Sequence, residues 1–466
     1  MGNCAVILAG GQGKRMKADM PKALCEVLDT PMLDWVTKAA EDSGINDICI
    51  VTGYRHEDID KHLNGKYETV VQTERLGTGH AVMQARDFLS TRPDGHTIIF
   101  YGDAPFIDKE TITDALDLHI KNDHAVTVVT SIADDPTGYG RIVRDEEGIK
   151  AIVEHRDCTP TQLMINEVNS GVYWFKTADL LDVIFDISPN NAQGEYYLTD
   201  AISLLLQKGK KAGSYISQNK NVALGANDRR GLLNLNNIAR MEIINRHLDN
   251  GVNFTCTDGV IIGQNVMIGV GTTIQGGTIL QGFTNIGENC DIGPNTLISN
   301  CTVGNETKLN SIQAADSVIG NNVKIGPFVN IRPGSVIKDR VKIGDFVEIK
   351  NSVIDEATSV AHLTYIGDSD VGKNVNFGCG CTTANYDGEN KYRTVVGDNS
   401  FIGCNTNLIA PVKVGKSAYT AAGSTITRDV PDGALAIERG QTVVKEGFAT
   451  RKLKVRTEKF EKAKRK

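Results

Sequence analysis

The stretch that decides the fold of the second half of the chain is "SVIGNNVKIGPFVNIRPGSVIKDRVKIGDFVEIK", residues 317–350. Isoleucine returns at every sixth residue, and glycine follows three of the six isoleucines: Ile319, Ile325, Ile331, Ile337, Ile343 and Ile349. A fixed period of six with one apolar residue per short strand is typical of a β-helix, in which each flat face receives one strand per repeat. The spacing continues on both sides, as in Ile262 with Ile268 and Val396 with Ile402.

Two interruptions of this period, at residues 351–365 and 379–395, are the first places to look for a binding site. Insertions into stacked coils emerge as loops on one face, and such loops often carry function. The polar candidates within the interruptions are His362, Tyr365, Asn385, Tyr386 and Lys391.

Two cations stand where the repeat often has glycine. Arg332 directly follows Ile331 and Lys350 directly follows Ile349, so three full repeats separate the two cations. Because three repeats of six make one turn, we expect these two side chains to stack in adjacent coils.

The segment 1–228 follows another pattern, in which apolar strand-like segments alternate with helix-like ones. The strand-like segments are residues 47–54, 97–103, 125–132 and 170–176, and the helix-like ones include 31–42 and 110–122. This alternation predicts a mostly parallel sheet with helices on both faces, whose ligands bind beyond the carboxyl ends of the strands. Apolar residues at helical spacing in 229–250 predict one connecting helix.

A glycine-rich basic loop, "ILAGGQGKRMKADMPK" at residues 7–22, follows the first apolar run. Its glycines let backbone N–H groups approach phosphate oxygens, and Arg15 and Lys22 add charge, so the loop predicts a phosphate site. It is not a Walker A loop, because Arg15 follows Gly-Lys where Ser or Thr is needed, nor a dinucleotide fingerprint, because Met16 replaces the third glycine. Asp103, after the strand "IIFY", either holds Mg²⁺ or only shapes a turn, and its local sequence favours neither.

Composition narrows the class of protein. The 466 residues carry a formal net charge of −7, which gives no basic field for nucleic acid. The ten cysteines are scattered, without zinc-type pairing or a secretory signal, so we expect reduced thiols in a cytoplasmic protein. The "MGNCAV" start has Val6 where myristoylation needs Ser or Thr, and no apolar run approaches the ~20 residues that cross a bilayer. We expect neither a nucleic-acid nor a membrane partner.

A series of motifs carries a family resemblance. In chain order, "LAGGQGKRM", "PKAL", "QTERLGTGHA", "YGDAP", "GYGRI", "EYYLTD" and "GANDRRGL" resemble the sugar nucleotidyltransferases. With the β-helix added, residues 4–440 resemble the bifunctional family that combines N-acetylglucosamine-1-phosphate uridylyltransferase with glucosamine-1-phosphate N-acetyltransferase. The resemblance implies a Rossmann-like α/β domain and a left-handed parallel β-helix of hexapeptide repeats.

We divide the chain accordingly into four parts. They are a uridylyltransferase domain over 1–228, a connecting helix over 229–250, a β-helix acetyltransferase domain over 251–437 and a basic, solvated tail over 438–466.

Carried over residue by residue, the resemblance implies an N-terminal site for UTP, a sugar phosphate and Mg²⁺. Arg15 and Lys22 are the implied catalytic cations, and Asp103 and Asn227 are the implied Mg²⁺ ligands. The implied nucleotide and sugar contacts are Leu8, Gly11, Lys22, Gln72, Gly77, Thr78, Tyr101, Gly140, Glu154, Asn169, Thr199 and Asn227. These residue types suit a reaction in which the protein must position two polyanions and neutralise negative charge at the reacting phosphorus.

The resemblance also implies an acetyltransferase site in the β-helix, with His362 as its general base. An imidazole that titrates near neutrality suits an amine that must lose a proton, and we expect Glu348, one coil below, to orient the ring. The implied glucosamine-1-phosphate contacts are Arg332, Lys350, Tyr365, Asn376 and Lys391. The implied acetyl-CoA contacts are Cys379, Asn385, Tyr386, Cys404, Ala422 and Arg439.

Three positions depart from the family pattern. Cys379 stands where alanine is usual, Cys404 where serine is usual, and Ser359 where lysine is frequent. A thiol donates a weaker hydrogen bond than a hydroxyl, so the contacts to acetyl-CoA are the ones in doubt. A covalent acetyl-Cys404 route is conceivable, but direct attack in a ternary complex is the simpler hypothesis.

Two other functions fit the sequence less well. A single-activity nucleotidyltransferase with a β-helix for oligomerisation would not need His362, the paired cations or the "NYDG" loop at 385–388, and all are present. A regulatory subunit without turnover would be expected to lose Arg15, Lys22 or Asp103, and none is lost.

The family further implies a homotrimer built through the β-helices. It also implies a role in supplying UDP-N-acetylglucosamine for bacterial envelope polymers such as peptidoglycan and lipopolysaccharide.

Overall fold

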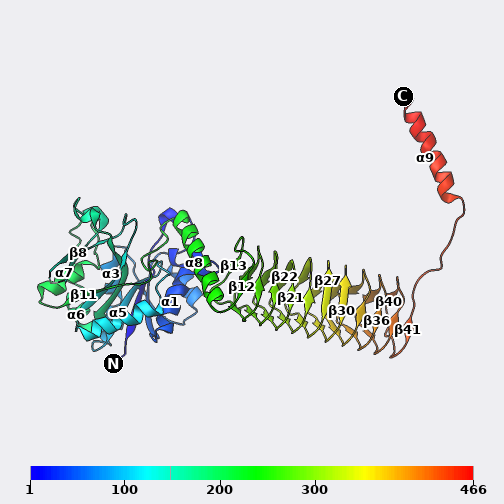
Figure 1. Cartoon of the computed structure of the whole chain (residues 1–466), viewed down its shortest axis with the longest axis horizontal. Coiled ribbons are helices and arrows are strands. Elements are labelled where there is room, and N and C mark those ends of the chain that lie inside the picture. Colours follow the sequence, from blue (N-terminus) through cyan, green and yellow to red (C-terminus); the bar gives the residue numbers. More distant parts are fainter. Residues whose placement is uncertain (1, 147, 465–466) are drawn as a thin grey trace. The chain divides into compact units, whose positions relative to one another are not determined.

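The computed structural model describes residues 2–146 and 148–464, which form two compact units (Figure 1). The first unit comprises Met1–Asn245 with Ile262–Gln264, and the second comprises Arg246–Ile261 with Asn265–Lys466. The helix α8 (Arg229–Asp249) runs through the point where the chain leaves the first unit.

The first unit is built on one mixed sheet. Its central strands, in spatial order, are β11 (Ala212–Ile216), β7 (Val126–Ile132), β10 (Glu167–Lys176), β6 (His96–Tyr101), β1 (Cys4–Leu8), β4 (Asp47–Thr52) and β5 (Glu68–Val71). All neighbours in this order are parallel except β10, which runs antiparallel to β6 and β7. A hairpin of β8 (Arg141–Asp145) and β9 (Gly148–Val153) joins the sheet through β10, and β2 (Glu26–Val27) pairs with β3 (Thr30–Pro31) apart from it.

Helices cover both faces of this sheet, which confirms the prediction of a layered α/β fold. They are α1 (Met32–Asp42), α2 (His56–Leu63), α3 (Thr78–Gln84), α4 (Arg86–Ser90), α5 (Lys109–Lys121), α6 (Thr177–Val183) and α7 (Asp200–Gln207), with 3₁₀ turns at Lys14–Met16, Lys22–Leu24, His155–Asp157 and Gln162–Met164. Successive strand residues point to opposite faces, so Val6 belongs to one apolar core and Ile7 to the other. Among the described residues, no helix is long and apolar enough to cross a membrane.

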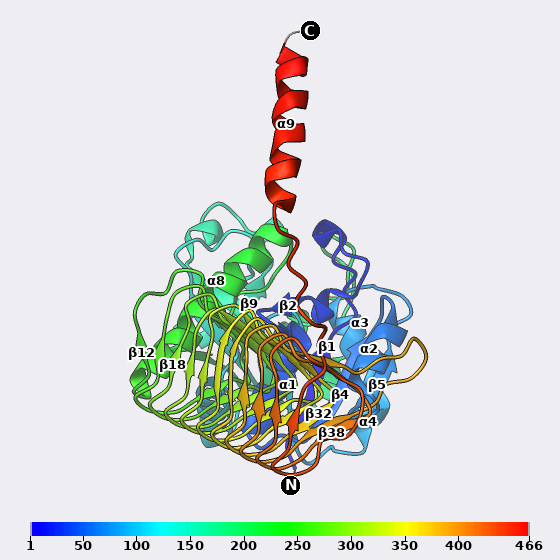
Figure 2. The same ribbon diagram turned by 90° about the vertical axis from the view of Figure 1, so that its right-hand side faces the viewer.

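The second unit is a left-handed β-helix whose coils contribute one short strand to each of three parallel sheets. Figure 2, turned by 90°, shows successive coils lying over one another. The first sheet contains β12 (Asn253–Phe254), β15 (Thr273–Ile274), β18 (Asp291–Ile292), β21 (Lys308–Leu309), β24 (Lys324–Ile325), β27 (Lys342–Asp345), β30 (Ser359–His362), β33 (Asn376–Phe377), β36 (Phe401–Ile402), β39 (Tyr419–Thr420) and β41 (Leu435–Ala436).

The other two sheets repeat the same arrangement. The second contains β13 (Ile261–Ile262), β16 (Ile279–Gln281), β19 (Leu297–Ser299), β22 (Ile312–Ala315), β25 (Val329–Ile331), β28 (Glu348–Lys350), β31 (Tyr365–Gly367), β34 (Thr382–Ala384), β37 (Asn407–Ile409) and β40 (Thr425–Ile426). The third contains β14 (Met267–Ile268), β17 (Asn285–Ile286), β20 (Thr302–Val303), β23 (Val318–Ile319), β26 (Val336–Ile337), β29 (Val353–Ile354), β32 (Ser369–Val371), β35 (Thr394–Val396) and β38 (Val412–Val414).

The hexad isoleucines fill the interior of this β-helix. All six isoleucines of the opening stretch are buried, and Ile331, Ile337 and Ile349 are fully so. The corners between strands require left-handed backbone, which asparagine and glycine adopt most readily; Asn322 (φ 56°) and Gly334 (φ 77°) are examples.

The two interruptions of the repeat differ in kind. The first was expected to be an insertion, and this is wrong: Lys342 pairs with Ser359, so the coil is one residue shorter than three hexads and stays in the stack. The second is an insertion, because Asn376 pairs with Phe401 and the coil between them is longer than three hexads. Its extra residues leave the stack between β34 and β35 and include the isolated pairing of Tyr386 with Lys391.

The chain ends in α9 (Phe448–Lys464), in which every described side chain is exposed.

Candidate active sites

The glycine-rich loop leaves β1 at Leu8 and folds around Lys22. The Ala9 N–H donates to the Val51 carbonyl at 2.8 Å, which holds the start of the loop to β4. At Gly13 the backbone is left-handed (φ 61°), and a Cβ there would lie 3.1 Å from the Cβ of Lys22. Glycine at this position therefore lets the loop close over the lysine.

Lys22 bridges two oxygen donors from distant parts of the chain. Its Nζ donates to Asn227 Oδ1 at 2.9 Å and forms an ion pair with Asp103. An ammonium group held between these oxygens shows that a cation fits here. One carboxylate and one amide oxygen match the small protein contribution that Mg²⁺ takes when phosphates supply other ligands. Within the described residues, no group of three or more His, Cys, Asp or Glu forms a metal cluster.

The loop and the bridge open into one cavity of about 450 Å³ at the carboxyl ends of the central strands. Ten of the residues expected at the nucleotide and sugar site line it: Leu8, Gly11, Lys22, Gln72, Gly77, Thr78, Tyr101, Asp103, Asn169 and Asn227. Arg75, Tyr139 and Glu195 line it too, although they were not singled out; they stand inside "QTERLGTGHA", "GYGRI" and "EYYLTD".

Gln72, Gly77 and Thr78 form part of one wall of the cavity. Gln72 is buried, and its Nε2 donates to the Gly77 carbonyl at 3.1 Å. Gly77 has a φ of 115°, and a Cβ there would lie 2.5 Å from the Tyr196 carbonyl oxygen, so the position requires glycine. Thr78 Oγ1 then accepts from the Leu198 N–H at 3.0 Å, which ties this wall to the segment before α7.

Gly140, Glu154 and Thr199, which were expected at the sugar pocket, are outside the residues that line the cavity, although Gly140 lies beside Asn169, which does line it. The Asn169 N–H donates to the Gly140 carbonyl at 2.9 Å, and a Cβ at Gly140 would lie 3.4 Å from Glu154 Oε1. Burial raises the pKa of Glu154, and the charges of Asp157 and Asp200 add to the shift.

Of two further expected residues, Tyr101 lines the cavity and Thr199 does not. Burial, aided by the Glu154 charge, raises the pKa of Tyr101 to about 12, so its hydroxyl remains a donor at neutral pH. The Thr199 hydroxyl is buried and, within the described chain, has no hydrogen-bonding partner. A buried hydroxyl without a partner is costly, which is what a group awaiting a ligand would show.

Arg15 lies in the 3₁₀ turn after the glycines and outside the residues that line the cavity. The Gly231 N–H lowers the pKa of Asp228, and the nearby charge of Arg15 contributes to the shift. The Arg229 guanidinium donates to the Met16 carbonyl at 2.9 Å and so fixes the end of this turn.

In the β-helix, three cations gather on adjacent coils. Ile331 pairs with Ile349, which sets Arg332 beside Lys350 and confirms the expected stacking. The neighbouring ammonium of Lys391, in the insertion, lowers the pKa of Lys350. Arg332 also donates from Nη1 to Glu348 Oε1 at 2.8 Å. Because positive side chains outnumber negative ones in this cluster, it is suited to bind a phosphate.

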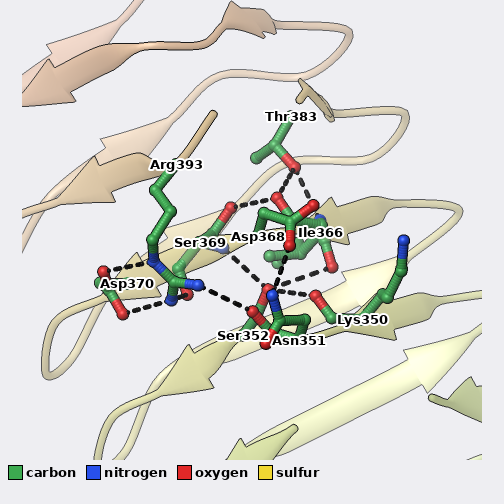
Figure 3. Close-up of polar contacts among 10 residues, drawn as sticks. Lys350, Asn351, Ser352, Ile366, Asp368, Ser369, Asp370, Thr383 and Arg393 are labelled. Atoms are coloured by element: carbon green, nitrogen blue, oxygen red, sulfur yellow. Dashed lines mark hydrogen bonds and ion pairs between the residues drawn. The ribbon is translucent and has the colours of Figure 1, made fainter. Parts of the chain in front are cut away.

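A buried carboxylate, Asp368, lies near Lys350 of this cluster (Figure 3). It accepts hydrogen bonds from Asn351 Nδ2 at 2.5 Å and from the Asn385 amide. Burial alone would raise its pKa, but these bonds and the charges of Lys350 and Lys391 outweigh burial, and the pKa of Asp368 is lowered. It therefore carries the negative charge that holds the insertion against the stack.

Arg393 fastens the far end of the insertion. Its Nε donates to Asp370 Oδ2 at 2.9 Å, and Nη1 donates to the Asn351 carbonyl at 3.1 Å (Figure 3). Neither Asp368 nor Arg393 had been singled out from the sequence, because polar residues are common at the corners of the repeat.

His362 ends β30 on an exposed edge of the β-helix. Asp345 lies opposite it in the coil below, whereas Glu348 lies opposite Tyr365 and bonds Arg332. The orientation of His362 by Glu348 therefore stays a prediction.

Three candidate acetyl-CoA residues, Cys379, Cys404 and Ala422, lie along the same edge, whereas Asn385 and Tyr386 lie in the insertion. The register that pairs β30 with β33 and β33 with β36 carries the edge from His362 to Cys379 and then Cys404. Arg439 Nη1 donates to the Ala422 carbonyl at 3.1 Å in the next coil. The Tyr365 ring lies over the backbone of its own strand, since a Cβ at Gly367 would be 2.4 Å from the Tyr365 hydroxyl oxygen.

Comparisons with known proteins agree with this division. Residues 4–228 match the nucleotidyl transferase family, and residues 316–351 and 393–428 match the bacterial transferase hexapeptide family of six repeats.

Full-length relatives cover almost the whole chain. A protein of Caldanaerobacter subterraneus subsp. tengcongensis named Bifunctional protein GlmU is 48% identical, with 97% of this chain and 98% of the relative aligned. Proteins of the same name from Acetivibrio thermocellus and Thermoanaerobacter pseudethanolicus are 44% and 46% identical, covering 98% and 97% of this chain and 99% of each relative.

Proposed function

We propose a division of labour between the two sites from the premise that this chain belongs to the family of bifunctional GlmU proteins. The β-helix acetylates glucosamine-1-phosphate with acetyl-CoA. The α/β unit then transfers UMP from UTP to N-acetylglucosamine-1-phosphate, giving UDP-N-acetylglucosamine and pyrophosphate. The observation that supports this most directly is that cations gather at two separate places, Lys22 at the cavity of the α/β unit and Arg332, Lys350 and Lys391 on the β-helix.

For the uridylyl transfer, we propose that the glycine loop and Lys22 hold the phosphates of UTP. The Gln72 and Gly77 wall receives the uracil, and Glu154, Asn169 and Thr199 receive the sugar. A phosphate oxygen of the sugar phosphate attacks the α-phosphorus, and pyrophosphate leaves. Positioning and charge neutralisation account for catalysis, since the protein forms no covalent bond in this step.

The family as a whole requires a divalent metal ion, and we propose Mg²⁺ held by Asp103 and Asn227. When bound, Mg²⁺ supplies positive charge to the phosphates. The Lys22 ammonium lies between these two oxygens in the structure, so we expect it to move onto a phosphate when the metal takes its place.

For the acetyl transfer, we propose His362 as the general base. Its ring accepts a proton from the amine of glucosamine-1-phosphate, the amine nitrogen bonds to the thioester carbonyl carbon, and the CoA thiol leaves. Arg332, Lys350 and Lys391 hold the substrate phosphate. Asp368 positions the insertion that brings Lys391 and Asn385 to this site.

We also propose a cytoplasmic homotrimer assembled through the β-helices, in keeping with the hexapeptide family. Light scattering of the purified protein would give three times the chain mass, and a monomer mass would contradict this assembly.

The experiment that tests the proposed function is product analysis by mass spectrometry. Native protein supplied with glucosamine-1-phosphate, acetyl-CoA, UTP and Mg²⁺ should produce UDP-N-acetylglucosamine. A His362→Ala sample should produce it only from N-acetylglucosamine-1-phosphate. If native protein also needed preacetylated sugar, the β-helix would have no acetyltransferase site.

A further inference from the structure

Two exposed cysteines lie side by side in neighbouring coils of the β-helix. Phe377 pairs with Ile402, and two residues further along this register Cys379 lies opposite Cys404. The pairing reaches this point, because the Asn405 N–H donates to the Cys379 carbonyl at 2.8 Å.

The spacing of the two coils suits a disulfide. Neighbouring strands lie roughly 4.8 Å apart, and disulfides join Cα atoms separated by roughly 4.4–6.8 Å. The Cys404 sulfur also leans toward the other coil, since a Cβ at Gly378 would lie 2.9 Å from Cys404 Sγ. Side-chain rotation with a small adjustment of the coils would therefore bring the two sulfurs together.

Exposure distinguishes this pair from most other thiols of the chain. Cys379 and Cys404 are free and exposed, and Cys256 is the third exposed cysteine among the described residues. Cys381, two residues from Cys379, is buried, and burial raises its pKa to about 11. Since the thiolate is the reactive form, Cys381 is protected while its neighbour is accessible.

We propose that Cys379 and Cys404 are a reversible redox site that switches off the acetyltransferase alone. One thiolate attacks a sulfur of a low-molecular-weight disulfide, such as oxidised glutathione, and releases one small thiol. The second thiolate attacks the protein sulfur of this mixed disulfide and releases the other small thiol. Two protein thiols become one disulfide, two protons are released to the small thiols, and the small disulfide is reduced.

The effect on activity rests on the proposed function of this edge. The register carries it from the general base His362 through Cys379 and Cys404 to Ala422, so the pair lies between the base and Ala422, another residue expected to contact acetyl-CoA. A disulfide would draw the two side chains together on the edge between His362 and Ala422. It would also remove the hydrogens of the two thiols, which can donate hydrogen bonds. The α/β unit contains neither cysteine, so its reaction is the internal control.

The test treats full-length protein with oxidised glutathione and then with dithiothreitol. Peptide mass spectrometry should find one Cys379–Cys404 cross-link within a single chain. Acetyl transfer should fall by about tenfold, the equivalent of losing roughly one binding contact, and should return on reduction, while uridylyl transfer stays constant. Cys256→Ser should behave like native protein, whereas Cys379→Ala should stop at a glutathione adduct on Cys404.

The outcomes separate the parts of the proposal. Glutathione adducts without a cross-link, or a cross-link between two chains on a non-reducing gel, would overturn the redox site. A cross-link that leaves acetyl transfer unchanged would overturn the switch. Reduced native protein without any acetyl transfer would instead overturn the proposed function, and the cross-link would still be tested by mass.

Discussion

The two units build their sites in opposite ways. In the α/β unit, side chains from well-separated segments such as Lys22, Gln72, Asp103 and Asn227 surround one cavity at the edge of a sheet. In the β-helix, many candidate residues stack from coil to coil on two sheets, as Arg332 does with Lys350 and Cys379 with Cys404, because residues one coil apart are neighbours. Sequence spacing therefore sets the geometry of the second site, whereas loop packing sets the first.

The largest effect is expected from removing the proposed general base His362, which should affect the β-helix site and leave the α/β site unchanged. Replacing His362 by Ala should lower acetyl transfer by about 10²–10⁴-fold, because the amine loses its proton acceptor. Uridylyl transfer should not change, and this is checked by assaying both reactions on one preparation. Equal losses in both reactions would show that the two sites depend on each other.

The matching change in the α/β unit is Lys22→Ala. It removes the cation that bridges Asp103 and Asn227, and we expect uridylyl transfer to fall by about 10²–10³-fold with acetyl transfer retained. Steady-state kinetics on each substrate measure this. Lys17→Ala, an exposed lysine of the same loop outside the cavity, is the matched control and should be near native.

Replacing a core residue of the β-helix tests whether the packing of its coils maintains the second site independently of the α/β unit. Ile349 is fully buried between the coils that carry Arg332 and Tyr365, and Ile349→Ala should cost about 2–5 kcal/mol of stability. Calorimetry should show a lower transition for the β-helix and an unchanged one for the α/β unit. A shift of the α/β transition by the same amount would mean that the units unfold together.

A smaller effect is expected from replacing Asp368, the buried carboxylate near Lys350 and Lys391. Asp368→Asn keeps the shape but removes the buried charge that faces Lys350 and Lys391 and accepts from Asn385. We expect a loss of about 1–3 kcal/mol in acetyl-transfer kcat/KM. Asp370→Asn, which alters only the contact with Arg393 on the surface, should have less effect. If Asp370→Asn were the more damaging change, the insertion would be held mainly by Arg393.

The last prediction concerns pH and the α/β unit. His119 is fully buried, and burial together with His96 lowers its pKa to about 3. The unfolded chain binds a proton near pH 6.5 that the folded chain does not, so stability is present above this pH and is lost as pH falls toward 3, by about 1.4 kcal/mol per unit. Denaturant unfolding between pH 7 and pH 4 measures the slope, and His119→Gln should flatten it.

The predictions from the sequence were most complete for the β-helix, where the structure repeats every six residues. The hexad isoleucines are buried as expected, and the stacking of Arg332 on Lys350 is confirmed, because both follow from a period alone. The parallel strands of the α/β unit were found too, but β10 begins at Glu167 and runs antiparallel, which a run of apolar residues does not reveal.

The contacts that were not predicted join residues far apart in the sequence, and spacing along the chain does not reveal them. In the sequence Asp368 resembles any other polar corner residue, and its contact with Asn385 of the insertion cannot be inferred from the repeat. The convergence of Gly140, Glu154 and Asn169 likewise depends on the pairing of β8 with both β9 and β10. The domain boundaries and the catalytic roles of individual residues stay predictions.

The central claim is that one chain carries two independent sites linked by a diffusing intermediate. Its most direct test mixes purified His362→Ala and Lys22→Ala proteins with glucosamine-1-phosphate, acetyl-CoA, UTP and Mg²⁺ and follows UDP-N-acetylglucosamine by mass spectrometry. Each variant alone should produce almost none, and the mixture should restore it, because one protein acetylates and the other transfers UMP. A mixture as inactive as its components, while each variant keeps its remaining partial reaction, would contradict free passage of the intermediate; loss of both partial reactions in either variant would contradict independent sites.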